Sequence, residues 1–203
     1  MVEHLKQMFS FDTRLPILHV HCDYKERVQQ GVVKLMSSFV KQAALHLRTS
    51  AGIPKDVIDA YVEHAHGETS LDLQELRVLL IKLLKCFRRS FLIIDALDEY
   101  VPSDGDAYSP ETVEIFNEVR KVASTCQGSC RLFVTSREQW LAPYEGVPAK
   151  RVEIIAKDKD ISSYVKSFIQ GDQFPRRFRE KIRKDPDFLA ETVDSLTRNA
   201  RGQ

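Results

Sequence analysis

The residues best placed to do chemistry follow an apolar run in the middle of the chain. Phe91-Leu92-Ile93-Ile94 leads directly into Asp95, and Asp98 and Glu99 follow within four residues. An apolar run of this length is typical of a strand buried on both faces of a parallel sheet. A carboxylate at its carboxyl end needs water, a partner or a metal, because burying an unpaired charge is costly. The pattern predicts Asp95 as a Mg²⁺ ligand, with acids beside it that orient water.

A second apolar run brings further polar groups to the same edge. Residues 131–134 are followed by Thr135-Ser136-Arg137. In open α/β sheets, ligands bind outside the carboxyl ends of the strands, so we expect Arg137 near Asp95. A guanidinium there can bind phosphate oxygens. The alternative is an ion pair of Arg137 with Asp95 or Asp98, which would hold an empty site together.

The acids also have structural interpretations. Asp95 could cap a nearby helix, and Asp98 with Glu99 could form an exposed acidic turn. A metal-dependent phosphohydrolase built on these acids is a further alternative, but the additional acids or histidines of a two-metal site are missing. Cys126 and Cys130 lack the companion ligands of a zinc site, so the cysteines are interpreted as structural or free thiols.

Strands and helices alternate along the chain, which predicts a parallel sheet with right-handed crossovers. We expect strands at residues 15–22, 91–94, 131–136 and 152–155. Apolar spacings of three and four predict helices at residues 27–47, 55–63, 71–87, 110–124, 161–169, 176–184 and 186–201. Thr69 and Ser70 are the expected N-caps of the third of these helices.

The order of these segments resembles a known family. Asp-Ala-Leu-Asp-Glu and Thr-Ser-Arg, each after an apolar run, resemble the Walker B and sensor 1 segments of NACHT-type signalling NTPases of the STAND class. The closest resemblance is to fungal proteins with a nephrocystin-like N-terminal domain, which residues 21–25 and 160–165 also resemble. The family implies Mg²⁺ coordination by Asp95, water activation by Asp98 and Glu99, and phosphate sensing by Thr135-Ser136-Arg137.

The family's phosphate-binding loop is missing from this sequence. Such NTPases hold phosphates with G-x-x-x-x-G-K-[ST] at a helix N-terminus, and no such loop occurs in the 203 residues. Residues 2–9 resemble the end of the helix that follows the loop, and residues 196–203 resemble a segment that usually continues into an apolar helix. We therefore expect a truncated core.

Composition is that of an ordinary globular protein. The net charge of +1 gives no argument for nucleic-acid binding. No run approaches the roughly 18 apolar residues of a membrane span. Four cysteines without a secretory leader favour a reducing compartment, so we expect a cytoplasmic protein.

These observations predict an α/β fold in two parts. Residues 1–156 should form a three-layer P-loop NTPase-like parallel sheet of about four strands, without the phosphate-loop strand. Residues 157–203 should begin a small helical lid subdomain. The predicted function is a fragment or degenerate form of a NACHT-type signal-transduction NTPase that acts as a non-catalytic interaction or regulatory module.

The alternative is a nucleotide-dependent ATPase or GTPase switch whose Walker A loop lies upstream. The family implies Mg²⁺ with ATP or GTP as ligands, and the missing loop argues against both here. It also implies protein partners, since intact members oligomerise and usually carry repeat sensor domains.

Overall fold

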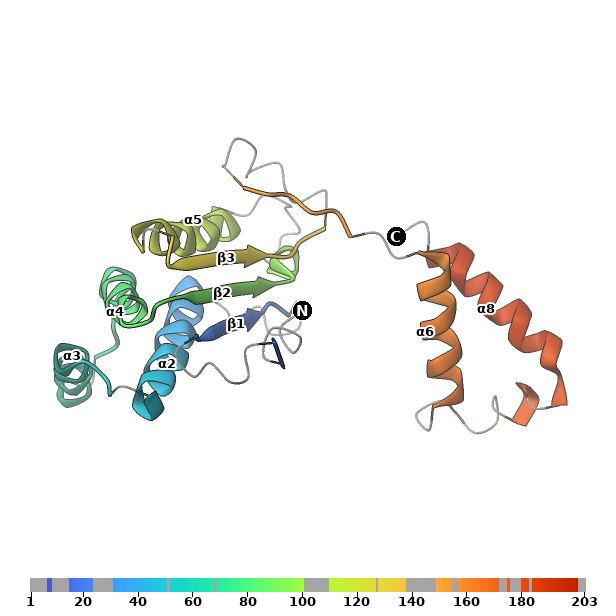
Figure 1. Ribbon diagram of the computed structural model, residues 1–203, viewed down its shortest axis with the longest axis horizontal. Helices are drawn as coiled ribbons and strands as arrows, with labels where there is room; N and C mark the ends of the chain where they lie inside the picture. The colour runs from blue at the N-terminus through green and yellow to red at the C-terminus, as the bar shows by residue number, and fades with distance from the viewer. Residues whose placement is uncertain are drawn as a thin grey trace. The chain divides into compact units, whose positions relative to one another are not determined.

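The computed structural model describes residues 7–8, 15–23, 31–50, 52–67, 69–100, 110–126, 128–137, 149–154, 157–171, 175, 180–182 and 184–200. The chain divides into two compact units, Met1–Val147 and Pro148–Gln203. We call these the N-terminal and the C-terminal unit. The first is α/β, and the described elements of the second are helices (Figure 1). The subdomain boundary after residue 156 stays a prediction.

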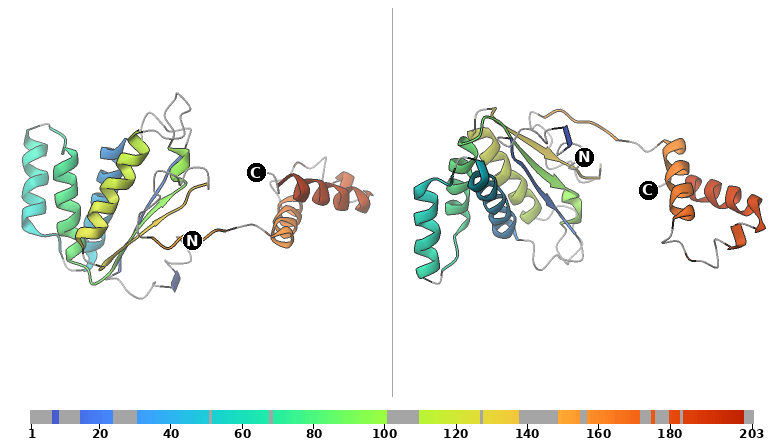
Figure 2. Two further views of the ribbon diagram at one scale, coloured as in Figure 1. Left: turned by 90° about the horizontal axis from the view of Figure 1, so that it is seen from above. Right: turned by 60° about the horizontal axis from the view of Figure 1, so that its bottom comes forward.

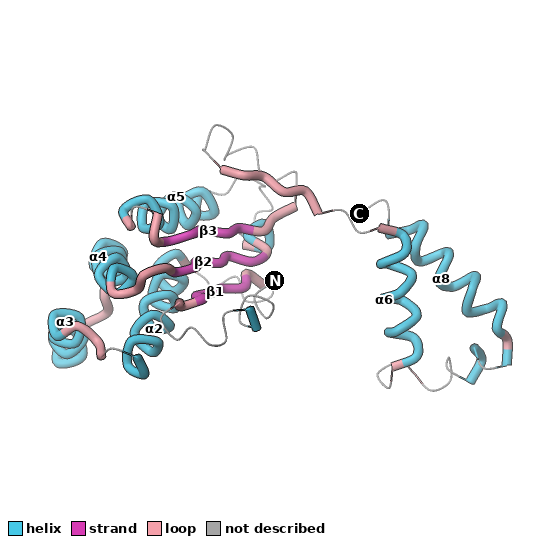
Figure 3. The backbone as a smooth tube through the Cα atoms, in the orientation of Figure 1, coloured by secondary structure: helices cyan, strands magenta, loops and turns pink. Residues whose placement is uncertain are grey.

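The N-terminal unit is built on a parallel sheet. Its strands are β1 (Ile17–His21), β2 (Ser90–Asp95) and β3 (Cys130–Val134), in the order β1-β2-β3 (Figure 3). Both pairings are parallel. The predicted α/β class with a parallel sheet is therefore confirmed, with β2 as the central strand of the described sheet.

Four helices of this unit lie on one face of the sheet (Figure 2). They are α2 (Val32–Ser50), α3 (Lys55–His66), α4 (Leu73–Lys85) and α5 (Pro110–Thr125). Side chains alternate between the two faces of a strand. Accordingly, Leu18, Leu92 and Ile94 enter the main core beneath the helices, while Ile17 and Ile93 belong to a separate cluster.

The apolar stripe of the helix predicted at residues 27–47 is confirmed from Val32, where α2 begins; residues 27–30 lie outside the described residues. Its spacings of three and four bury five side chains against the sheet and α4: Leu35, Met36, Phe39, Ala43 and Leu47. On the outer side of β1, the Gln42 side chain binds the backbone of His19 in both directions. The His19 N–H donates to Gln42 Oε1 at 3.0 Å, and Gln42 Nε2 donates to the His19 carbonyl at 2.9 Å. An edge strand exposes such groups, and α2 satisfies this pair.

The N-terminus of α4 differs from the prediction. Its cap is Asp72, and Thr69 and Ser70 lie before it. Asp72 Oδ1 accepts the Glu75 N–H and a Glu75 carboxylate oxygen accepts the Asp72 N–H, each at 2.8 Å. This reciprocal pair is a capping box, which satisfies two donors at once and so wins over a lone hydroxyl cap.

A buried ion pair joins α4 to α5. Glu118 on α5 accepts from Arg77 Nη1 of α4 at 2.9 Å and from Lys121 Nζ at 2.6 Å. Burial alone would raise the pKa of Glu118, but the hydrogen bonds and charges of its two partners outweigh burial and lower it. The carboxylate therefore stays charged inside the helical layer.

The prediction of a fourth strand at residues 152–155 is wrong for the part that the structure describes. Residues 149–154 form no strand, and Val152 and Ile154 are 67% and 88% exposed. An alternating apolar segment becomes a strand only where a neighbour pairs with it.

The C-terminal unit contains the helix pair α6 (Asp158–Gln170) and α8 (Pro186–Ala200). Lys181 lies 4.0 Å from the ring centre of Phe188, and Tyr164 stacks on Phe168 with ring centres 6.3 Å apart. Most of the helix predicted at residues 176–184 lies outside the described residues. Among the helices that the structure describes, none has the length and apolar character needed to cross a bilayer.

Candidate site at the carboxyl end of the sheet

The polar residues predicted to share an edge do lie together. Asp95 ends β2 and pairs in register with His21, the last residue of β1. Thr135 follows β3, and its N–H donates to the Ile94 carbonyl at 3.0 Å. Because the strands are parallel, all of these residues lie at the same carboxyl edge.

Asp95 is held by Thr135. The Thr135 hydroxyl donates to Asp95 Oδ1 at 2.6 Å and accepts the Ala96 N–H at 2.8 Å. The other oxygen, Oδ2, lies 3.3 Å from His21 Nδ1. With its side chain 49% exposed, the carboxylate has a fixed orientation and remains open to solvent. The structure describes no helix that Asp95 caps in this arrangement.

A tight turn carries the next two acids. Ala96 adopts φ 55°, a left-handed conformation that costs a residue with a Cβ roughly 1–2 kcal/mol. The short 3₁₀ helix η2 (Leu97–Glu99) follows, and the Leu97 N–H donates to the Thr135 carbonyl at 2.9 Å. The end of β3 thus holds the turn after β2, and the turn directs Asp98 inward.

Asp98 and Arg137 form an ion pair. The Asp98 side chain is 5% exposed, so an exposed acidic turn is excluded for this residue. Its Oδ1 accepts the backbone N–H of Arg137 at 3.2 Å, and its Oδ2 accepts from Arg137 Nε. The Arg137 side chain is 65% exposed. Asp95 and Asp98 were the two predicted partners of Arg137. Arg137 therefore pairs with Asp98, while Asp95 is bound by Thr135.

Comparison with known proteins adds the family. A family model described as Nephrocystin 3, N-terminal, matches residues 1–137. The chain belongs to this family. The match ends at Arg137, so it includes every residue of the candidate site. The predicted resemblance to nephrocystin-like N-terminal domains is thus confirmed. No curated protein matches the chain.

His21 and Cys22 also lie beside the acids, which sequence reasoning missed. The Cys22 N–H donates to the Asp95 carbonyl at 2.9 Å. Burial, and then the charges of the nearby acids, raise the pKa of the Cys22 thiol to about 12. A thiol that stays protonated is a poor nucleophile at neutral pH. Their position in the sequence could have indicated this contact, since residues 21 and 22 end a predicted strand at the same edge.

The remaining predicted residues take lesser places in the site. The Ser136 hydroxyl donates to the Arg137 carbonyl at 3.3 Å, so Thr135 and not Ser136 contacts Asp95. Glu99 is half-buried in η2, close enough to Cys22 to raise the pKa of its thiol.

A metal at this edge would need ligands beyond the side chains that the structure describes. In the described part of the chain, no cluster of three or more His, Cys, Asp or Glu side chains is arranged to bind an ion. Mg²⁺ is often bound by one or two carboxylates together with water and phosphate oxygens. The half-exposed Asp95 fits that limited role.

Proposed function

We propose that this domain is a non-catalytic interaction or regulatory module derived from NACHT-type signalling NTPases. In this proposal Arg137 stabilises the strand edge through Asp98, in the place where an active relative would hold phosphate. The observation that carries the proposal is the engagement of both Asp98 oxygens by Arg137. An acid that is buried and paired is poorly placed to activate water.

The missing phosphate loop supports the same function. A Gly-rich loop supplies a nest of backbone N–H groups and a lysine for the phosphates. The 203 residues contain no such sequence. Without these donors, one exposed guanidinium would have to supply most of the phosphate affinity. We propose proteins rather than nucleic acids as partners, since the net charge is +1, and the cytoplasm as the location.

Titration calorimetry with Mg·ATP and with Mg·GTP tests the proposal. We expect no binding in the micromolar range for either nucleotide. Arg137→Ala should give the same flat titration as wild type, because the guanidinium is committed to Asp98. A micromolar isotherm that Arg137→Ala abolishes would overturn the proposal and identify Arg137 as a phosphate ligand.

One observation favours a second function, a nucleotide-dependent switch whose phosphate loop lies outside these 203 residues. Thr135 orients the Asp95 carboxylate, which is 49% exposed and so within reach of a hydrated Mg²⁺. In that case Asp95 would hold the metal and Thr135 would fix the geometry of the carboxylate.

Thermal melts with and without millimolar Mg²⁺ separate the two functions. If the domain is a non-catalytic module, Mg²⁺ should leave the melting temperature of wild type unchanged. It should also leave the melting temperature of Asp95→Asn unchanged. A wild-type melting temperature that rises with Mg²⁺, and an Asp95→Asn melting temperature that does not, would favour the switch.

A further inference from the structure

Helix α3 carries an apolar face that the domain does not cover. All residues of α3 are described, and Val57 is the buried side chain that it contributes to the core. Ile58, Tyr61, Val62 and Ala65 are exposed, Tyr61 to 70%. Their spacing of i, i+3, i+4 and i+7 places them along one side of the helix, the pattern with which helices pack on other helices.

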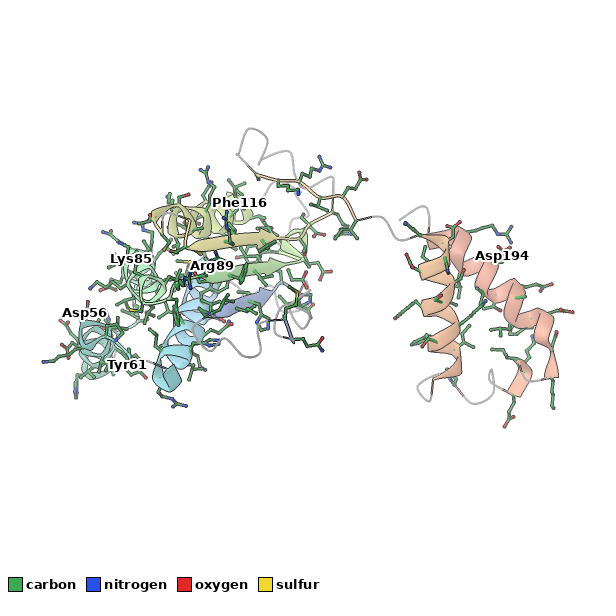
Figure 4. The ribbon with its side chains drawn as sticks, in the orientation of Figure 1. Asp56, Tyr61, Lys85, Arg89, Phe116 and Asp194 are labelled. Atoms are coloured by element: carbon green, nitrogen blue, oxygen red, sulfur yellow. The ribbon has the colours of Figure 1, made fainter. Side chains whose placement is uncertain are left out.

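Three polar contacts fix α3 in its orientation. Lys82 Nζ of α4 donates to Asp56 Oδ2 at 2.6 Å. The two ring nitrogens of His64 lie 2.8 Å from Thr69 Oγ1 and 3.0 Å from Glu75 Oε1. Asp56 and Tyr61, both labelled in Figure 4, project from different sides of α3. The polar contacts therefore hold one side of the helix against α4, while the apolar face points away from it.

We propose that this face is a homodimer seam, in which α3 packs antiparallel on α3 of a second copy of the chain. A two-fold axis between Tyr61 and Val62 places Ile58 opposite Ala65 of the second copy and Tyr61 opposite Val62 of the second copy. Each large side chain then meets a smaller one, which lets the two surfaces interdigitate. A two-fold interface requires this kind of self-complementarity.

Polar residues beside the face fit the same arrangement. Asp59 and His66 are seven residues apart, so they lie on one flank of the helix. In an antiparallel pair, Asp59 lies near His66 of the second copy, and the contact occurs twice by symmetry. In a parallel pair the two-fold axis runs along the helices and sets this flank against the opposite flank of the second copy, so Asp59 and His66 would not meet.

The seam is short, so the dimer should be weak. A helix of 12 residues is roughly 18 Å long, which places the interface at the small end of the known size range. We expect a dissociation constant on the order of 100 µM. Such an interface acts where the local concentration of the chain is high. It lies apart from the strand-end site and does not depend on nucleotide.

Sedimentation equilibrium of the full chain tests the seam. Wild type should show a monomer–dimer equilibrium, and Tyr61→Glu should weaken it by about tenfold or more, because dimerisation would bury the new charge. Tyr164→Glu is the matched control, since Tyr164 is 71% exposed on α6. It should leave the equilibrium unchanged. Far-UV circular dichroism should show that both variants keep their helices.

Disulfide trapping tests the orientation. Ile58→Cys combined with Ala65→Cys, in a Cys86→Ser background that removes an exposed thiol, should give a 58–65 cross-link between copies under mild oxidation. A wild-type chain that stays monomeric near millimolar concentration would overturn the proposal. So would a dimer that Tyr164→Glu weakens as much as Tyr61→Glu, or cross-links restricted to 58–58 and 65–65.

Discussion

Replacing Arg137 with alanine gives the sharpest test of the strand-end ion pair. The substitution removes the Nε donor from Asp98 Oδ2 and keeps the backbone N–H that binds Oδ1. The Asp98 side chain is 5% exposed, so water replaces the lost donor poorly. Arg137→Ala should therefore destabilise the N-terminal unit.

The expected loss in the free energy of unfolding follows from the exposed fractions of the Asp98 and Arg137 side chains. A hydrogen bond to a charged group contributes roughly 1.5–3 kcal/mol. Arg137 is 65% exposed, so solvent screening weakens the charge term and favours the lower half of that range. We expect a loss of about 2 kcal/mol. With a urea slope of roughly 2 kcal/mol/M, the unfolding midpoint should fall by about 1 M.

Urea unfolding followed by far-UV circular dichroism measures this loss. Arg131→Ala is the control, because Arg131 is an exposed arginine on β3, the strand that precedes Arg137, and it should cost less than about 0.5 kcal/mol. Asp98→Asn completes a double-mutant cycle, in which the two sites should couple by roughly 1–2 kcal/mol. A loss below about 0.5 kcal/mol for Arg137→Ala, or additive effects in the cycle, would refute the proposed role of the ion pair.

Three further substitutions test the supports of the sheet and of the helical layer. Gln42→Ala should cost about 1–2 kcal/mol, from two hydrogen bonds, and should speed amide exchange at His19; unchanged exchange would contradict the edge contact. Glu118 has a lowered pKa in the folded state, so its contribution is present above the unfolded pKa and is lost as pH falls through the folded pKa. Glu118→Gln should therefore flatten the acid limb of a stability–pH curve, and an unchanged acid limb would count against this assignment. Asp72→Ala should cost about 1 kcal/mol, seen as faster exchange in the first turn of α4, and protection equal to that of wild type would argue against the capping box.

The elements that could be predicted from the sequence are those with a strong local pattern. The apolar runs before Asp95 and Thr135 became β2 and β3, and the stripe of α2 entered the core as expected. The segment at residues 152–155 is also rich in apolar residues, but strand formation depends on a neighbour that the local pattern does not specify. For α4, the order Asp-Leu-Gln-Glu at residues 72–75 already matched a capping box.

For contacts between distant residues, the sequence could predict which residues lie near one another, but not which of them form a pair. Parallel strand ends brought Asp95, Asp98 and Arg137 to one edge, as their positions in the sequence implied. The choice of partner depended on the left-handed turn at Ala96, which directs Asp98 inward. The Gln42 contact with β1 follows no periodic pattern, because it joins a helix side chain to the backbone of a strand.

Thr135 makes the geometry of the acids depend on the pairing of β3. Its hydroxyl holds Asp95 and the Ala96 N–H, and its carbonyl accepts the Leu97 N–H. Two residues later, Arg137 binds the acid that this turn positions. A shift of β3 relative to β2 would therefore move Thr135 and Arg137 together, and would change the orientation of Asp95 and the pairing of Asp98 in one step.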